Sequence, residues 1–265
     1  MRSPFPMSTQ FTQALLRRPA ATYAAGITTS AEGAPDLPVA QRQHGAYALA
    51  LESLGLSLTV LEADNAYPDG VFVEDTAIIT ARGAILTRPG AASRQGEAIE
   101  IGQRLRERFG DIAVITAPGT VDGGDICETD DGVLIGLSAR TNAAGAEQLA
   151  GWLRDLGYAS QIIDIRPIPR LLHLKTGISY LGDGRMAVAG DLPPMPQFSR
   201  FEVVMTTPAE AYVANCVRVN HKVLVAAGYP RFADTLAGLG YDPLPLDMSE
   251  YRKMDGGLSC LSLRF

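Results

Sequence analysis

The sequence predicts an α/β fold in which five copies of one unit close into a barrel or propeller. Three observations predict it: four regularly spaced β-hairpin signals, helical patterns after most of them, and strand-like segments at both chain ends. Each hairpin signal is an apolar strand, a turn containing Gly or Asn, and a second apolar strand. The turn centres are 37 to 52 residues apart, a spacing typical of repeat architectures. The four hairpins are expected over residues 76–87, 126–137, 178–189 and 216–226.

A helix and a third strand are expected to complete each unit. Apolar residues recur with the helical period at 93–109, 141–156 and 231–239, and the weaker segment 193–200 takes the place of a helix in the remaining unit. Each is followed by a short, largely apolar segment that we interpret as a strand. These third strands are expected over 112–115, 161–165, 202–205 and 243–246.

The two ends of the chain supply a fifth unit. Residues 259–265 and 13–17 are strand-like, residues 39–54 have the helical period, and residues 56–61 form a further apolar segment. Pairing of the C-terminal strand with the N-terminal strand would close the ring and leave no broken unit. The alternative fold is a doubly wound parallel sheet, but hairpins in every unit argue against a purely parallel arrangement.

Length, composition and charge limit the class of protein. A chain of 265 residues with 46% apolar content can bury a core, so we predict one domain over residues 13–265, preceded by a disordered extension over residues 1–12. The formal charge of -6 and the scattered arginines do not suggest a nucleic-acid partner. No segment is apolar for long enough to cross a membrane, and we expect a cytoplasmic protein.

Polar residues gather in the segments that lead from the third strand of one unit into the first strand of the next. If the units are equivalent, these segments lie at one end of the ring near its axis. Their side chains would then converge on one concave pocket, which is the usual form of an enzyme site. The residues in question are Asp69, Glu74, Asp75, Asp122, Asp125, His173, Asn215, Asp255 and Cys260.

Cys260 is the candidate nucleophile among three cysteines that form neither a disulfide framework nor a zinc motif. It lies five residues from the C-terminus and follows the turn 255–257, Asp-Gly-Gly, which we interpret as flexible. A structural thiol would be of little use at a chain end. Cys127 and Cys216 lie among apolar strand residues, and for them we keep a structural role.

His173 is the candidate acid/base partner of the thiol. Thiol chemistry needs a neighbouring imidazole and a carboxylate that orients it, and Asp122 is a candidate for that carboxylate. The alternatives are a buried core histidine and a simple Asp-Gly turn. His44, on a helix face, and His221, at a hairpin turn, fit surface positions.

The segment 68–75 and two arginines suggest an arginine-like substrate. Three acids surround the apolar centre Val-Phe-Val of this segment, where a cation would relieve their mutual repulsion. A guanidinium offers several donors in a fork that matches carboxylate oxygens. Arg94 and Arg140 occupy equivalent places between a second strand and a helix, and they suggest a clamp for a substrate carboxylate. Decoration of a helix start is the alternative, although arginine is disfavoured there.

Seven stretches carry a family resemblance, and they span nearly the whole chain from about residue 14 onward. They are PDGVFVEDTA (68–77), TRPGAASRQG (87–96), APGTVDGGD (117–125), SARTN (138–142), HLKTG (173–177), ANC (214–216) and SEYRKMDGGLSC (249–260). Each stretch alone is weak, but all seven in this order make the chain resemble the dimethylarginine dimethylaminohydrolases of the pentein, or guanidino-group-modifying, superfamily. The resemblance implies a five-bladed α/β-propeller of ββαβ units.

The resemblance also implies roles for individual residues. Cys260 corresponds to the nucleophile, His173 to the proton donor, and Asp122 to the residue that orients the histidine. Members related to the bacterial prototype carry Glu at that place, so the carboxylate here reaches one methylene less far. The implied substrate contacts are Asp69, Glu74 and Asp75 at the cationic end and the α-amino group, Arg94 and Arg140 at the α-carboxylate, and the backbone of Ile27 and Met254.

The implied activity is hydrolysis of methylated arginines, asymmetric dimethylarginine and monomethylarginine, to citrulline and an alkylamine. It would proceed through a covalent thiouronium on Cys260. An arginine deiminase or a citrulline hydrolase is the close alternative, and a binding scaffold that needs neither thiol nor histidine is the remote one. We expect no cofactor and no metal, a small-molecule substrate as the partner, and neither nucleic acid nor membrane. A homodimer is left open.

Overall fold

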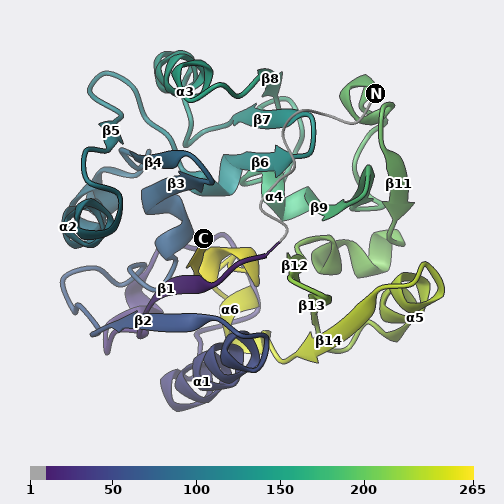
Figure 1. Ribbon diagram of the computed structural model, residues 1–265. Helices are drawn as coiled ribbons and strands as arrows, with labels where there is room; N and C mark the ends of the chain where they lie inside the picture. The colour runs from purple at the N-terminus through teal and green to yellow at the C-terminus, as the bar shows by residue number, and fades with distance from the viewer. Residues whose placement is uncertain (1–9) are drawn as a thin grey trace.

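The computed structural model describes residues 10–265, in which five three-stranded sheets surround a common axis (Figure 1). The predicted closed ring of five ββαβ units is therefore confirmed, and the doubly wound sheet is not formed. The first sheet consists of β15 (Leu263–Arg264), β1 (Gln13–Arg17) and β2 (Ser57–Leu61). The others, in chain order, consist of β3 (Ala77–Thr80), β4 (Gly83–Leu86) and β5 (Ala113–Val114); β6 (Ile126–Thr129), β7 (Gly132–Leu137) and β8 (Ser160–Asp164); β9 (Ile178–Gly182), β10 (Arg185–Val188) and β11 (Glu202–Met205); and β12 (Val217–Val219), β13 (Lys222–Ala226) and β14 (Asp242–Leu246).

One pairing scheme recurs in every sheet. The first and second strands pair antiparallel, as in β6 and β7, and the second and third pair parallel, as in β7 and β8. A tight hairpin joins the antiparallel strands in four sheets, whereas β15 and β1 are the two ends of the chain. Parallel neighbours need a crossover, which an α-helix supplies in every unit except that of β10 and β11. Four longer helices lie at the periphery of the ring (Figure 1): α1 (Leu37–Ser53), α2 (Ala98–Phe109), α3 (Ala143–Asp155) and α5 (Pro230–Gly238).

Two of the predicted helices differ from their expectation. The segment 193–200 contains only the short 3₁₀ turn Pro196–Phe198, and prolines at 193, 194 and 196 explain why no α-helix forms there. Ahead of α2, the stretch Ala92–Glu97 is a 3₁₀ helix rather than the first α-helical turn. This stretch carries Arg94, whose guanidinium is committed to a buried ion-pair network described below.

The ring is closed between the two ends of the chain, as predicted. Leu263 and Arg264 pair antiparallel with Leu15 and Ala14 of β1. Regular hydrogen bonding also begins before residue 13, although a disordered extension was predicted over residues 1–12. Residues 1–9 lie outside the described residues, but Thr12 N–H already donates to the carbonyl of Phe265.

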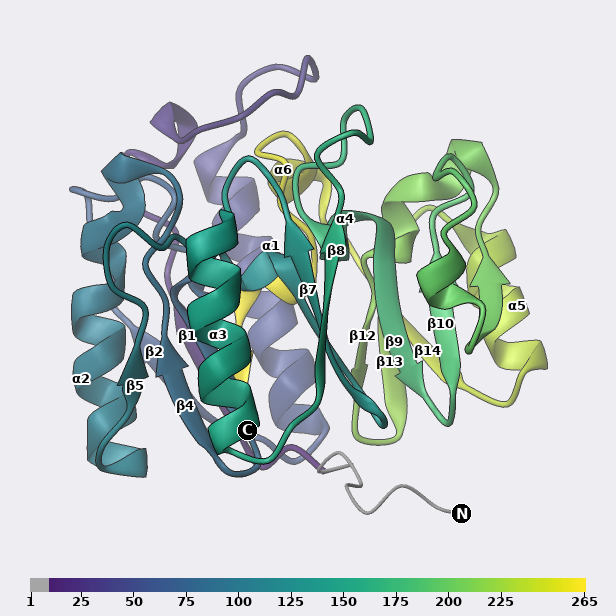
Figure 2. The same cartoon turned by 90° about the horizontal axis from the view of Figure 1, so that it is seen from above.

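Short helical turns precede the first strand of every unit and gather at one end of the axis. Figure 2 shows two of the short helices, α4 (Leu174–Gly177) and α6 (Ser249–Arg252), toward this end, while the hairpin between β12 and β13 points the other way. Besides α4 before β9, the turns of this kind are Val73–Thr76 before β3, Gly123–Asp125 before β6, Pro208–Ala214 before β12 and Ser259–Leu261 before β15. The last of these carries Cys260, the predicted nucleophile.

Four apolar clusters fill the space between the sheets and the outer helices. One interpretation from the sequence was wrong: His44 on α1 is buried, not at the surface, and burial together with Arg18 lowers its pKa to about 4. His221 is exposed as expected, and Cys127 and Cys216 are buried among apolar residues. Within residues 10–265, no helix combines the length and hydropathy needed to cross a bilayer.

Asn220 fastens the chain end to the ring. It lies in the β12–β13 turn at a left-handed φ of 55°, accepts a hydrogen bond from Phe11 N–H at 2.7 Å, and donates to the carbonyls of Phe11 and Leu54. We expect Asn220→Gly, which keeps φ unstrained but removes these three hydrogen bonds, to lower the free energy of unfolding by about 1–3 kcal/mol. Chemical denaturation measures this value.

Asp183 provides the matched control, because it has the same φ in the β9–β10 turn but makes only an exposed ion pair with Arg218. Asp183→Gly is expected to change stability by no more than about 0.5 kcal/mol. Equal losses in both variants would show that the turn conformation, and not the bonds to Phe11 and Leu54, is what Asn220 contributes.

Candidate active site

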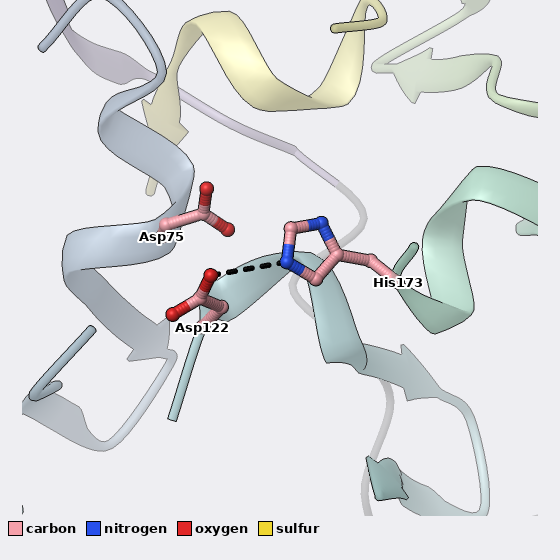
Figure 3. A group of neighbouring side chains, drawn as sticks. All are labelled: Asp75, Asp122 and His173. Carbon is pink, nitrogen blue, oxygen red and sulfur yellow. Dashed lines mark hydrogen bonds and ion pairs between the residues drawn. The ribbon is translucent and has the colours of Figure 1, made fainter. Parts of the chain in front are cut away.

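His173 and Asp122 form a buried pair near the axis. The Nε2 atom of His173 lies 3.1 Å from Oδ2 of Asp122, and Asp75 stands beside them (Figure 3). His173 caps the start of α4, while Asp122 directly precedes the Gly123–Asp125 turn and accepts a hydrogen bond from Gly90 N–H. The chain permits this approach because a Cβ on Gly124 would lie only 2.7 Å from Nδ1 of His173.

The surroundings of His173 favour its protonated form. Burial by itself would lower its pKa, but the carboxylates of Asp75, Asp125 and Asp122 outweigh burial and raise the pKa to about 9. The imidazole can therefore carry a proton at neutral pH. A protonated imidazole in this position can act as a general acid.

Cys260 lies in the 3₁₀ turn Ser259–Leu261, half-buried against an apolar cluster that includes Phe72 and Leu258. Burial, Glu74 and Asp75 raise the pKa of its thiol to about 12. The thiol is consequently protonated in the free protein. A cation placed beside it would favour the thiolate.

The turn ahead of Cys260 is not the flexible segment that the sequence suggested. Gly256 and Gly257 are buried, and a Cβ on Gly257 would lie 2.3 Å from Oδ1 of Asn215. The same atom on Gly256 would lie 2.3 Å from the ring of Phe72. The glycines are needed for close packing, and the thiol is held rather than loosely presented.

Glu74 is engaged on both of its oxygens. Lys175 Nζ donates to Oε1 at 2.6 Å and the Ser259 hydroxyl donates to Oε2 at 2.8 Å. Asn215 in turn donates to the Ser259 oxygen and accepts from its N–H. Lys175 and Ser259 were not predicted as site residues, although both lie in the quoted motifs, adjacent or nearly adjacent to His173 and Cys260. Their positions in these motifs, and not their residue types, could have identified them as site residues.

Arg94 makes a buried ion-pair network. Its Nη1 donates to Asp75 at 2.7 Å and its Nη2 donates to Glu97 at 2.8 Å, with further bonds to the carbonyls of Asp69 and Phe72. Burial alone would raise the pKa of Asp75, but His173 and Arg94 hold it below its ordinary value. Glu97, whose pKa burial raises to about 7, is a further residue that the sequence did not single out.

Arg140 contrasts with Arg94. Its Nη1 is buried and has no hydrogen-bond partner within residues 10–265. Its main chain is pinned, since Arg140 N–H donates to Ser138 Oγ and Gly90 packs against its carbonyl so closely that a Cβ there would lie 2.2 Å away. A fixed guanidinium with a spare buried donor is suited to an anionic ligand group.

Asp69, Ile27 and Met254 come together next to the ion-pair network of Arg94. Ile27 N–H donates to both oxygens of Asp69, at 3.0 and 3.2 Å, while burial raises the pKa of Asp69 against Arg94 and this N–H, which lower it. Met254 is buried and its N–H donates to Tyr251, so a main-chain contact from Met254 to a ligand would use its carbonyl oxygen.

Two further acids from the same segments do not belong to this group. Asp125 is buried and accepts from the hydroxyls of Ser138 and Thr141 and from Leu174 N–H, which marks it as a structural carboxylate. Asp255 accepts instead from Thr29 on the neighbouring loop.

Metal ligation was not predicted, yet one cluster in the described chain has suitable spacing. The donor atoms of Asp75, Asp122 and His173 lie within 4.8 Å of one another. The contacts inside it already account for these groups: His173 meets Asp122, and Asp75 accepts from Arg94 and from Gly124 N–H. The absence of a metal requirement stays a prediction.

The pKa of His173 generates a testable pH dependence. Because it lies above the ordinary value of about 6.5, the stability it contributes is fully present below that pH and is lost as pH rises through about 9. We expect Asp122→Asn, which removes one of three carboxylates, to lower the pKa of His173 by at least about one unit. The loss of unfolding free energy between these two pH values should become smaller.

Nuclear magnetic resonance titration of the His173 ring, together with denaturation at several pH values, measures both effects. Asp131→Asn, in the exposed β6–β7 turn, is the matched control and should leave the His173 titration unchanged. An unaltered His173 pKa in Asp122→Asn would contradict the assignment of Asp122 as a carboxylate that raises this pKa.

Comparison with known proteins places this geometry among relatives. The arginine deiminase family model matches residues 65–192. The chain is 44% identical to an N(G),N(G)-dimethylarginine dimethylaminohydrolase of Pseudomonas aeruginosa over 96% of this chain and 100% of that one. It is 34% identical to the protein of the same name from Streptomyces coelicolor, with 95% and 96% covered.

Solved structures agree with these matches. A mutant of the Pseudomonas aeruginosa enzyme complexed with citrulline has a TM-score of 0.93 and 42% identity, with 97% of this chain and 100% of that chain covered. An adduct of a dimethylarginine dimethylaminohydrolase with S-methyl-L-thiocitrulline gives the same TM-score, identity and coverage. The N-terminal domain of a cyanobacterial arginine dihydrolase shares the fold at 17% identity, with a TM-score of 0.86 and coverage of 96% and 97%.

Proposed function

This chain belongs to the dimethylarginine dimethylaminohydrolase family, and we propose that it hydrolyses asymmetric dimethylarginine and monomethylarginine to citrulline and an alkylamine. The observation that carries the proposal is the 44% identity to a dimethylarginine dimethylaminohydrolase over the full length of that enzyme. The buried His173–Asp122 pair and Cys260, at the same end of the ring, supply the groups that such a reaction needs.

In this proposal the substrate's positive charge activates the nucleophile. Asp75 and Asp69 provide counter-charge for the cationic substrate. Glu74 provides further counter-charge: like Asp75 it already accepts a hydrogen bond on each oxygen, and each oxygen keeps a second lone pair for the substrate. The bound guanidinium favours loss of the Cys260 proton to solvent, and the thiolate then lies beside an electrophilic carbon.

Two steps complete the reaction. The Cys260 Sγ bonds to the guanidinium carbon, His173 protonates the alkylated nitrogen, and the C–N bond breaks to release the amine and leave a thiouronium on sulfur. Neutral His173 then takes a proton from an attacking water. The C–S bond breaks with the electron pair returning to sulfur, and the remaining hydroxyl proton passes to the released amine or to solvent. Asp122 holds the imidazole in place throughout.

We further propose that Arg140 and Arg94 recognise the substrate's α-carboxylate, with main-chain groups of Ile27 and Met254 completing the pocket. The spare buried donor of Arg140 supports a direct contact. Arg94 would have to exchange one of its present partners, Asp75, Glu97 or a carbonyl, to make the same contact. Arg140 is therefore the better candidate for the primary anchor.

An arginine deiminase or a citrulline hydrolase remains the alternative on the same fold, and the arginine deiminase family match over residues 65–192 is the observation in its favour. Methylated substrates need an apolar niche beside the thiol. Phe72 and Leu258 share the apolar cluster against which Cys260 packs, whereas the neighbouring Val73 belongs to the cluster beneath α2. We also propose that residues 13–265 act as one catalytic domain in the cytoplasm.

An assay of the released amine tests the function. With pure protein we expect dimethylamine from dimethylarginine and methylamine from monomethylarginine, and roughly 10- to 200-fold less product from arginine, because a pocket shaped for methyl groups discriminates by about 1–3 kcal/mol.

Cys260→Ser should lose at least about three orders of magnitude in turnover and still bind substrate. Rapid ammonia release from arginine or citrulline, without alkylamine, would favour the alternative, and an active Ser variant would disprove the covalent step.

Separate kinetics test the carboxylate anchor. Arg140→Ala is expected to raise KM for dimethylarginine by at least about tenfold, the loss of one charge-assisted hydrogen bond, while KM for a methylated agmatine, which lacks the carboxylate, stays nearly constant. Arg94→Ala should in addition lower the melting temperature, because it leaves Asp75 and Glu97 buried without their cation. Equal KM changes on both substrates in Arg140→Ala would contradict the anchor.

A further inference from the structure

A cavity of about 790 Å³ lies inside the ring of first strands, on the other side of the Glu74–Lys175 pair from the thiol. Residues of β3, β6, β9, β12 and β15 line it, and Figure 1 shows β3, β6, β9 and β12 toward the axis. It runs from Glu74, Lys175 and Ser259 to the hairpin turns that contain Asp183 and Asn220. We propose that this axial cavity is a binding site for a small zwitterion of the α-amino-acid class, held between Glu128 and Arg264.

The axial cavity is distinct from the catalytic pocket. Asp122, His173 and Cys260 do not line it. The Glu74–Lys175 ion pair and the Ser259 hydroxyl bond to Glu74 close the end that faces the thiol. Its volume lies within the range of about 300–1,000 Å³ that small-molecule sites occupy.

Two charged groups in its wall stand out because each has a buried atom without a hydrogen-bond partner in residues 10–265. They are Oε1 of Glu128 and Nε of Arg264. Leaving a buried polar atom unpaired costs free energy, so such atoms call for a ligand, which includes water. The ion pairs in the wall join Lys175 and Arg264 to Glu74, and Arg218 to Asp183.

The guanidinium of Arg264 is oriented and only partly used. Its Nη1 donates to the hydroxyl of Ser262 at 2.7 Å and to the carbonyls of Ser262 and Ser259. Its Nη2 lies 3.8 Å from Oε1 of Glu74, and within residues 10–265 its Nε has no hydrogen-bond partner. A carboxylate oxygen is the natural acceptor for such a donor.

The balance of charge selects a zwitterion over a simple ion. Lys175 and Arg264 contribute two positive charges to the inner part of the cavity, and Glu74 and Glu128 contribute two carboxyl groups. Burial raises the pKa of Glu128 to about 7, although Lys175 and Arg264 act in the opposite direction. An ammonium group would keep Glu128 ionised, and a carboxylate on the same molecule would meet Arg264, so the net charge would not change.

Titration of the full-length protein with three small probes tests this site. Glycine is the zwitterion, and methylammonium and acetate carry its two charges separately. The δ1-methyl resonances of Ile79 and Ile126, both in the cavity wall, report occupancy. We expect saturable shifts with glycine and much weaker ones with either ion. Absence of saturable shifts with glycine would overturn the proposal in favour of a cavity that holds only water. An equal response to all three probes would also overturn it, because the cavity would not select a zwitterion.

Substitutions locate the binding. Glu128→Gln should weaken glycine binding by at least about tenfold, without lowering the melting temperature, because it removes a carboxyl whose buried Oε1 has no hydrogen-bond partner within residues 10–265. Asp183→Asn, a matched change at the paired rim, and Arg140→Ala, in the catalytic pocket, should both leave the glycine titration unaltered. Binding that survives Glu128→Gln, or that disappears with Arg140→Ala, would place glycine elsewhere. These outcomes do not depend on turnover, so they are separable from the proposed hydrolase activity.

Discussion

Compensation of buried carboxylates is the constraint on which this structure depends. Asp75 and Asp122 are almost completely buried, and ionised carboxylates in such places are tolerated only with cations and donors around them. Arg94 and His173 supply the positive charge, and the N–H groups of Gly124 and Gly90 supply hydrogen bonds. The protonation of His173 is a consequence of that balance. Burial, Glu74 and Asp75 oppose ionisation of Cys260, so Asp75 both favours the protonated His173 and helps to keep the thiol protonated.

The ring supplies the rigid frame that this balance needs. Each unit places a short helical turn before its first strand, and these turns carry Asp75, Asp125, His173 and Cys260 to one end of the axis. Close packing fixes them, as at Gly124 against His173 and Gly257 against Asn215. Because the turns come from different units, closure between β15 and β1 is needed to bring Cys260 to the others.

The two ends of the axis differ in how their buried charged groups are paired. Among residues 10–265, the charged groups around Asp122 and His173 have named partners, apart from one donor of Arg140. Beyond the Glu74–Lys175 pair, the inner strands line a cavity in which Glu128 and Arg264 each have one buried atom with no hydrogen-bond partner in the same residues. Buried charged groups of this kind in a cavity wall are positions where ligand recognition is expected.

The sequence alone determined the architecture, and it predicted which residues react. Hairpin turns, helical periods and strand-like chain ends are local patterns, and local patterns report the order of elements; five such units can bury their faces only by closing on one another. The family motifs pointed to Cys260, His173 and Asp122 for the same reason, since each lies in a short contiguous stretch. What only the tertiary structure decided is how charge is shared: that Lys175 and Ser259 occupy Glu74, that Arg94 is committed to Asp75 and Glu97 while Arg140 keeps a spare donor, and that the glycines before Cys260 pack tightly. These properties depend on distances and burial between residues far apart in the chain, which residue type and spacing do not encode.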